Sequence, residues 1–180
     1  MSTGGIIAII VIVVIILLIL AAFGVMQSRK RQQTSNLQQQ FGPEYDRAVE
    51  KTGDPKAAQQ ELEARRDHVQ ELSLQPLSLD QRNQYSEEWR STQAQFVDDP
   101  GGAVKHADEL ITQVMQTRGY PANAFDERAS DVSVVYPNDV ENYRVAHGIA
   151  QRDANGQANT EDLRDAMVRY RSLFEQLLKT

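Results

Sequence analysis

Three histidines are the side chains of this sequence that titrate closest to neutral pH, so acid–base or metal chemistry is sought there first. They are His68, His106 and His147. A di-iron site in a helical bundle needs a glutamate three residues before each of two histidines. The residues at those positions are Arg65, Ala103 and Arg144. The chain also has no cysteine, which excludes thiolate zinc sites, disulfides and cysteine nucleophiles. We therefore expect neither a metal nor another cofactor.

His147 is the one candidate for a general base. It follows Tyr143-Arg144-Val145-Ala146 in a segment with helical spacing, and Glu141 or Asp139 could orient its ring. The alternative is a partly buried histidine that packs at a helix junction. The sequence carries no Gly-x-Ser-x-Gly elbow, P-loop or Gly-x-Gly-x-x-Gly motif. We therefore expect a protein that is not an enzyme, with catalysis by His147 as the lesser alternative.

Aromatic side chains offer a second kind of site, because aromatic residues often anchor protein interfaces. They could line a binding groove, or they could form the core of a domain that has few aromatics. The candidate interaction surface consists of Trp89, Phe96, Tyr120, Tyr143 and His147. The net charge of −6 argues against nucleic acid as the partner, since phosphate binding needs a basic face. The expected partner is an unidentified protein.

The first part of the chain is strongly apolar. Residues 6–26 carry no charged side chain and would span roughly 31 Å as a helix, close to the thickness of a hydrocarbon core. Residues 1–5 contain no lysine or arginine, unlike the start of a cleaved signal peptide. The sequence thus predicts a transmembrane anchor at residues 1–28, in contact with the lipid bilayer through residues 6–26.

A basic flank follows this segment. Arg29, Lys30 and Arg31 predict that the rest of the chain lies on the cytoplasmic side. Residues 29–40 form this flank and a glutamine-rich spacer, which could be a flexible tether or a helix. All 25 acidic side chains lie beyond residue 31, so the body of the protein is acidic. An envelope-facing structural protein with the opposite topology is the alternative.

Residues 41–180 contain the helix start and stop signals that are typical of a soluble helical domain. Helices are predicted to begin at Pro43, at Asp54-Pro55, at Ser78 and at Asp99-Pro100, where caps and proline favour a first turn. Glycine or proline should end them at Gly53, Pro76 and Gly119. Further helices are expected over residues 125–135, 139–152 and 160–178, although Val132–Val135 could also be a strand. The predicted fold is all-α, with one N-terminal transmembrane helix and about six further helices, for which a bundle is one open arrangement.

Several short motifs resemble a family of uncharacterised bacterial helical proteins. They are Phe41-Gly42-Pro43-Glu44-Tyr45-Asp46-Arg47-Ala48-Val49, Phe96-Val97-Asp98-Asp99-Pro100, Arg118-Gly119-Tyr120-Pro121, Tyr143 to His147, and Asn159 to Arg164. The resemblance implies a bacterial source and a helical body, often associated with a membrane. It implies no activity, cofactor or catalytic residue.

These observations together predict a single-pass protein of the bacterial inner membrane. Its helical body is expected to lie in the cytoplasm and to act as a protein-interaction module.

Overall fold

The structure is a computed structural model, and it describes residues 34–179. The chain divides into two units, residues 1–40 and residues 41–180. In the first unit, residues 34–40 are helical. The part of the glutamine-rich spacer that the structure describes is therefore a helix, one of the two alternatives that the sequence left open.

The predicted fold needs correction in its membrane-spanning part. The expected span at residues 6–26 and its flank of Arg29, Lys30 and Arg31 lie outside the described residues. Across residues 34–179, no helix is both long enough and apolar enough to cross a membrane. The physical reason is that the described helices bury one apolar face and carry charged or polar side chains on the others. Within residues 34–179 the structure supports an all-helical fold, and none of these helices is the membrane-spanning, single-pass anchor that the sequence predicted.

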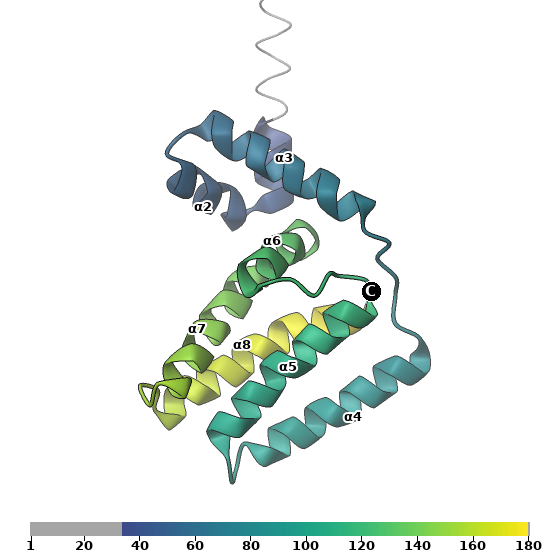
Figure 1. The fold of residues 1–180 in the computed structure, drawn as a ribbon, viewed down its shortest axis with the longest axis vertical. Coiled ribbons are helices and arrows are strands. Elements are labelled where there is room, and N and C mark those ends of the chain that lie inside the picture. The colour runs from purple at the N-terminus through teal and green to yellow at the C-terminus, as the bar shows by residue number, and fades with distance from the viewer. Residues whose placement is uncertain (1–33, 180) are drawn as a thin grey trace, which may run out of the picture. The chain divides into compact units, whose positions relative to one another are not determined.

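Seven complete helices follow one another between residues 43 and 179 (Figure 1). In chain order they are α2 (Pro43–Thr52), α3 (Pro55–Glu71), α4 (Leu79–Gln95), α5 (Pro100–Thr117), α6 (Phe125–Val135), α7 (Val140–Ala154) and α8 (Thr160–Lys179). The described residues contain no strand. The prediction of an all-α body is confirmed for this part of the chain, with seven helices in place of about six.

Most helix ends lie where the local sequence predicted them. Asp54 accepts a hydrogen bond from the backbone N–H of Lys56, and Ser78 forms a reciprocal capping box with Gln81. Gly119 adopts a φ of +100° just beyond α5, as expected of a residue that stops a helix. Two details differ from the prediction. Helix α3 ends at Glu71 and not at Pro76, and Val132–Val135 is helical and not a strand.

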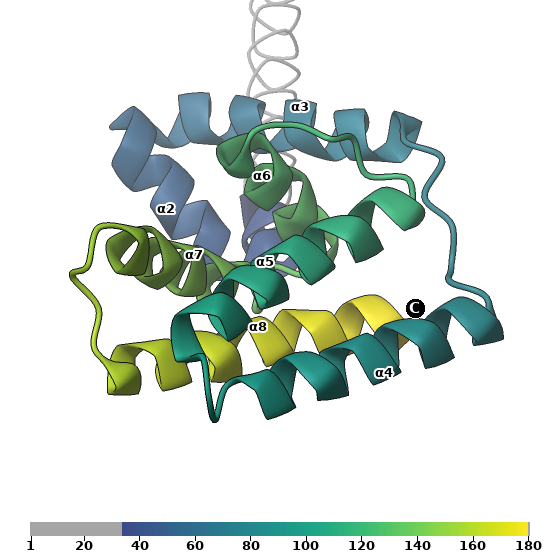
Figure 2. The same cartoon turned by 60° about the horizontal axis from the view of Figure 1, so that its bottom comes forward.

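The main apolar core is built from the segment that begins at Leu77. Helix α8 packs against α5 and α7, and α5 packs against α4, so that α4, α5 and α8 lie side by side in Figure 2. Trp89 of α4 stacks on Phe174 of α8, with ring centroids 4.6 Å apart. Within the described residues, this continuous core includes no buried side chain of α2 or α3.

Helices α2 and α3 pack on each other as a helical hairpin, residues 43–71, that has buried apolar side chains of its own. Those side chains are Tyr45, Ala48, Ala58, Leu62 and Val69. The hairpin meets the rest of the domain mainly through α3 and α6. What holds it there must therefore be sought in the contacts between these helices, and many of these contacts are polar.

Candidate interaction site between the hairpin and helices α6 and α7

The aromatic residues that the sequence singled out do not form one exposed surface. Trp89, Tyr120 and Tyr143 are buried in the core, where apolar packing and not partner binding accounts for them. Phe96 is partly exposed and lines a groove of about 180 Å³ between α4 and α8. His147 is also partly exposed and lies on α7. Trp89, Tyr120 and Tyr143 therefore fit the alternative that the sequence left open, a core of aromatic residues, whereas Phe96 and His147 stay partly exposed.

His147 has a carboxylate neighbour that the sequence did not predict. Its Nδ1 lies 3.4 Å from Oδ1 of Asp108 on α5, and its ring stacks on Phe125 with centroids 3.6 Å apart. The same Asp108 oxygen accepts a hydrogen bond from the Tyr170 hydroxyl at 3.0 Å. Although Nδ1 is close to Asp108, it has no partner with hydrogen-bond geometry among the described residues. Burial, and next the nearby charge of Asp108, raise the pKa of the Tyr170 hydroxyl, so it remains a hydrogen-bond donor.

The two acids expected to orient His147 are engaged elsewhere. Glu141 pairs with Arg47 at 3.1 Å, and Asp139 accepts a hydrogen bond from Ser172. The sequence did not predict the contact with Asp108, because Asp108 lies on α5, far from His147 along the chain. In the described part of the chain, no group of three or more histidine and acidic side chains is arranged to hold a metal ion.

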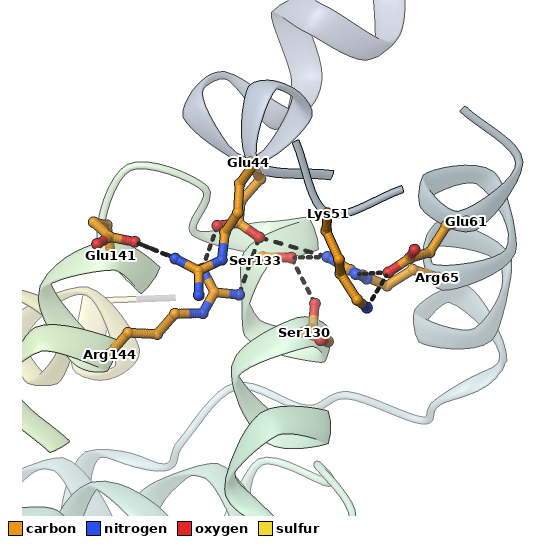
Figure 3. Close-up of polar contacts among 9 residues, drawn as sticks. Glu44, Lys51, Glu61, Arg65, Ser130, Ser133, Glu141 and Arg144 are labelled. Carbon is orange, nitrogen blue, oxygen red and sulfur yellow. Dashed lines mark hydrogen bonds and ion pairs between the residues drawn. The ribbon is translucent and has the colours of Figure 1, made fainter. Parts of the chain in front are cut away.

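A charge cluster surrounds Glu44 of α2, which is 3% exposed, the lowest exposure of any charged residue that the structure describes. Arg144 of α7 donates to both oxygens of its carboxylate, one at 3.0 Å, and Nη1 of Arg65 on α3 lies 3.5 Å away (Figure 3). Such paired hydrogen bonds from a planar guanidinium fix geometry as well as charge. A buried carboxylate that would otherwise be costly is therefore compensated by two arginines from two other helices.

Arg65 connects this cluster to the remaining helix. Its side chain also pairs with Glu61 at 2.8 Å and donates to the hydroxyl of Ser133 on α6 at 3.2 Å. Lys51 of α2 reaches the same Glu61 at 3.1 Å (Figure 3). Arg65 thus lies where α2, α3, α6 and α7 approach one another, and its position is fixed from several sides.

Two neighbouring cavities open beside this cluster, with volumes of about 260 Å³ and about 560 Å³. They have five lining residues in common, so we treat them as one cleft. The shared residues are Lys51, Glu61, Arg65, Asp126 and Ser130. Glu44, Arg47, Ala48 and Arg144 complete the smaller part, and His68, Asn123, Glu127 and Asp131 complete the larger part. We call these thirteen residues the hairpin cleft.

Asp131 is the unusual residue of the hairpin cleft. It is 5% exposed, and its Oδ2 has no hydrogen-bond partner in the region that the structure describes. Its other oxygen, Oδ1, lies 3.7 Å from Nε2 of His68, beyond hydrogen-bond length. Burial raises the pKa of the Asp131 carboxyl, while the nearby His68 and Arg65 lower it. The carboxylate is held in a place that its neighbours only partly compensate.

Comparisons with protein-family models, with curated proteins and with solved structures find no match to the chain. The resemblance to a family of uncharacterised bacterial helical proteins therefore stays a prediction, and the geometry of the described residues carries the functional argument.

Proposed function

We propose that this chain is a helical protein-interaction module that holds a segment of a partner protein in the hairpin cleft. The observation that carries the proposal is the cleft itself, whose larger part has a volume of about 560 Å³. That volume lies within the roughly 300–1,000 Å³ typical of ligand sites, but those sites are mostly apolar. The hairpin cleft is lined mainly by charged and polar side chains, which suits a polar chain segment better than a small apolar molecule.

The walls of the cleft are also held in place before any partner arrives. Arg144 and Arg65 are tied to Glu44, and Lys51 is tied to Glu61. Side chains that are already ordered lose little conformational entropy on binding. A fixed pattern of charges can select a partner by complementarity, which contributes more to specificity than to raw affinity.

Site-directed photocrosslinking tests the proposal. The full chain would carry benzoylphenylalanine at Asn123, a loop residue that lines the larger part of the cleft, in the cells that make the protein. The matched control carries the same group at Val168, which is 63% exposed and lines the groove between α4 and α8. Adducts with one protein from position 123, and none with that protein from position 168, are expected. No adduct from position 123, or the same adducts from both positions, would overturn the proposal.

A further inference from the structure

Asp131 is a buried carboxylate whose charge is not fully used within the protein. Its Oδ2 lacks a partner in the described residues, and its contact with His68 is 3.7 Å long. Folded proteins rarely leave a buried charged group in this condition, because the lost hydration is not replaced. When they do, the group is a candidate for a binding role.

The charges around Asp131 indicate which ligand would complete it. Asp126, Glu127 and Glu61 line the same part of the cleft, so four carboxylates face it. The two permanent cations there are already paired: Lys51 with Glu61, and Arg65 with Glu44 and Glu61. Even when His68 is counted as a cation beside Lys51 and Arg65, the four carboxylates of the larger part outnumber the cations, so a cation is the complementary ligand.

The form of that cation follows from the same geometry. The described residues offer no group of three or more side chains that could hold a metal ion. A buried carboxylate that lines an open polar cavity suits a cationic group on a flexible stem, which can reach inward while its chain stays at the rim. Arginine and lysine side chains have this shape, and both donate several hydrogen bonds.

We propose that Asp131 anchors an arginine or lysine side chain of the segment bound in the hairpin cleft. The proposal rests on the proposed function, because it names the chemistry by which that same site recognises its partner. The partner's ammonium or guanidinium donates to the Asp131 carboxylate, and the exposed Asp126 and Glu127 favour its approach electrostatically.

Fluorescence anisotropy with labelled peptides tests the anchor on the full chain. Three peptides of identical sequence, Gly-Ser-X-Ser-Gly, carry arginine, lysine or neutral citrulline at X. The arginine and lysine peptides should bind saturably, and the citrulline peptide at least 10-fold more weakly. Asp131→Asn should weaken the arginine peptide at least 10-fold, whereas Asp98→Asn, an exposed acid remote from the cleft in sequence, should leave it unchanged. Equal binding of the arginine and citrulline peptides, or equal binding to wild type and Asp131→Asn, would overturn the anchor.

Thermal unfolding separates an anchor from a structural residue. If Asp131 serves a ligand, Asp131→Asn removes an uncompensated buried charge, and the free protein should melt at the same or a higher temperature. A lower melting temperature would show that Asp131 holds the fold through His68 and would refute the anchor.

Crosslinking at Asn123 tells the two proposals apart. If the adduct at position 123 forms at full yield in Asp131→Asn, the result supports the interaction module and refutes the anchor. If no adduct forms in the wild-type background, the result refutes the interaction module itself.

Discussion

Replacing Glu44 by glutamine should lower the free energy of unfolding by about 3 kcal/mol. Breaking a buried ion pair by removing one charge costs roughly 3–5 kcal/mol, because the partner is left buried and uncompensated. We expect the lower end of this range for Glu44→Gln because both arginine partners are slightly exposed and each keeps another carboxylate. Arg65 and Arg144 are 12% and 14% exposed at their side chains, Arg65 keeps Glu61 at 2.8 Å, and Arg144 keeps Glu141 at 3.9 Å.

The loss should fall on the hairpin, because its buried apolar side chains lie outside the main core. Urea is the denaturant of choice, since guanidinium chloride would screen the charges under test. Hydrogen exchange should accelerate in α2 and α3 and change little in α5 and α8. The matched control is Glu50→Gln, an exposed acid on the same helix, for which a change within about 0.5 kcal/mol is expected.

Two results would refute this reasoning. A loss below about 1 kcal/mol would mean that the Glu44 pairs behave like exposed salt bridges, which contribute that little. Exchange that accelerates equally in α2, α3, α5 and α8 would mean that the hairpin does not open as a separate unit.

Three further changes test other parts of the structure. Gly119→Ala should cost about 1–3 kcal/mol in a urea titration, because φ is +100° and the added Cβ would lie 2.8 Å from the backbone oxygen of Ser73; an unchanged midpoint would contradict this. Ser78→Ala should lower the free energy of unfolding by about 1 kcal/mol, because it removes the hydroxyl that accepts the Gln81 N–H at the start of α4. A urea midpoint equal to that of the wild type would refute this role of the cap. The pH dependence of Asp131→Asn follows from its raised pKa: the folded state favours the neutral carboxyl, so ionisation destabilises the wild type as pH rises through that pKa. The variant's melting temperature should therefore match or exceed that of the wild type at neutral pH. The difference should disappear as pH falls below about 3.8, the ordinary pKa of an aspartate in the unfolded chain, and a difference that grows in acid would refute the sign.

The ends of the helices could be predicted because the signals for them are local. Asp54-Pro55 and Asp99-Pro100 each place an acceptor directly before a residue that lacks an N–H, and both pairs begin helices as expected. The prediction that α3 ends at Pro76 was wrong, because a contact with a distant segment determines where the helix ends. Gln75 donates its N–H to the carbonyl of Arg118, at 2.8 Å, which holds the chain after Glu71 in an extended form. Such a contact lies beyond any window of neighbouring residues.

The strand alternative at Val132–Val135 failed for a related reason. β-branched residues have lower helix propensity, but the preference is small and tertiary context overrides it. Val132 is fully buried against the core, while Asp131 and Ser133 on the same turn face the hairpin contacts. Ala129, Val132 and Tyr136 all belong to the core, and their spacing of three and four residues fits a helix and not the alternation of a strand.

The candidate site was beyond prediction for a different reason. Glu44 and Arg144 are 100 residues apart, and charged side chains on an amphipathic helix are ordinarily solvated. The one local signal was the spacing of Glu61, Arg65 and His68, which places all three on one face of α3. Aromatic residues drew attention because they are common at interfaces, but here most of them are needed to fill the core.

The stacked pair of Trp89 and Phe174 has a practical consequence for experiments on this protein. Trp89 is the single tryptophan of the chain, so intrinsic fluorescence reports on the packing of α4 against α8. Far-ultraviolet circular dichroism, in contrast, includes the helical signal of α2 and α3. If the hairpin unfolds before the core does, the circular dichroism transition will precede the fluorescence transition under the same conditions. Tryptophan fluorescence alone would then report an intact molecule after the hairpin cleft has already been lost.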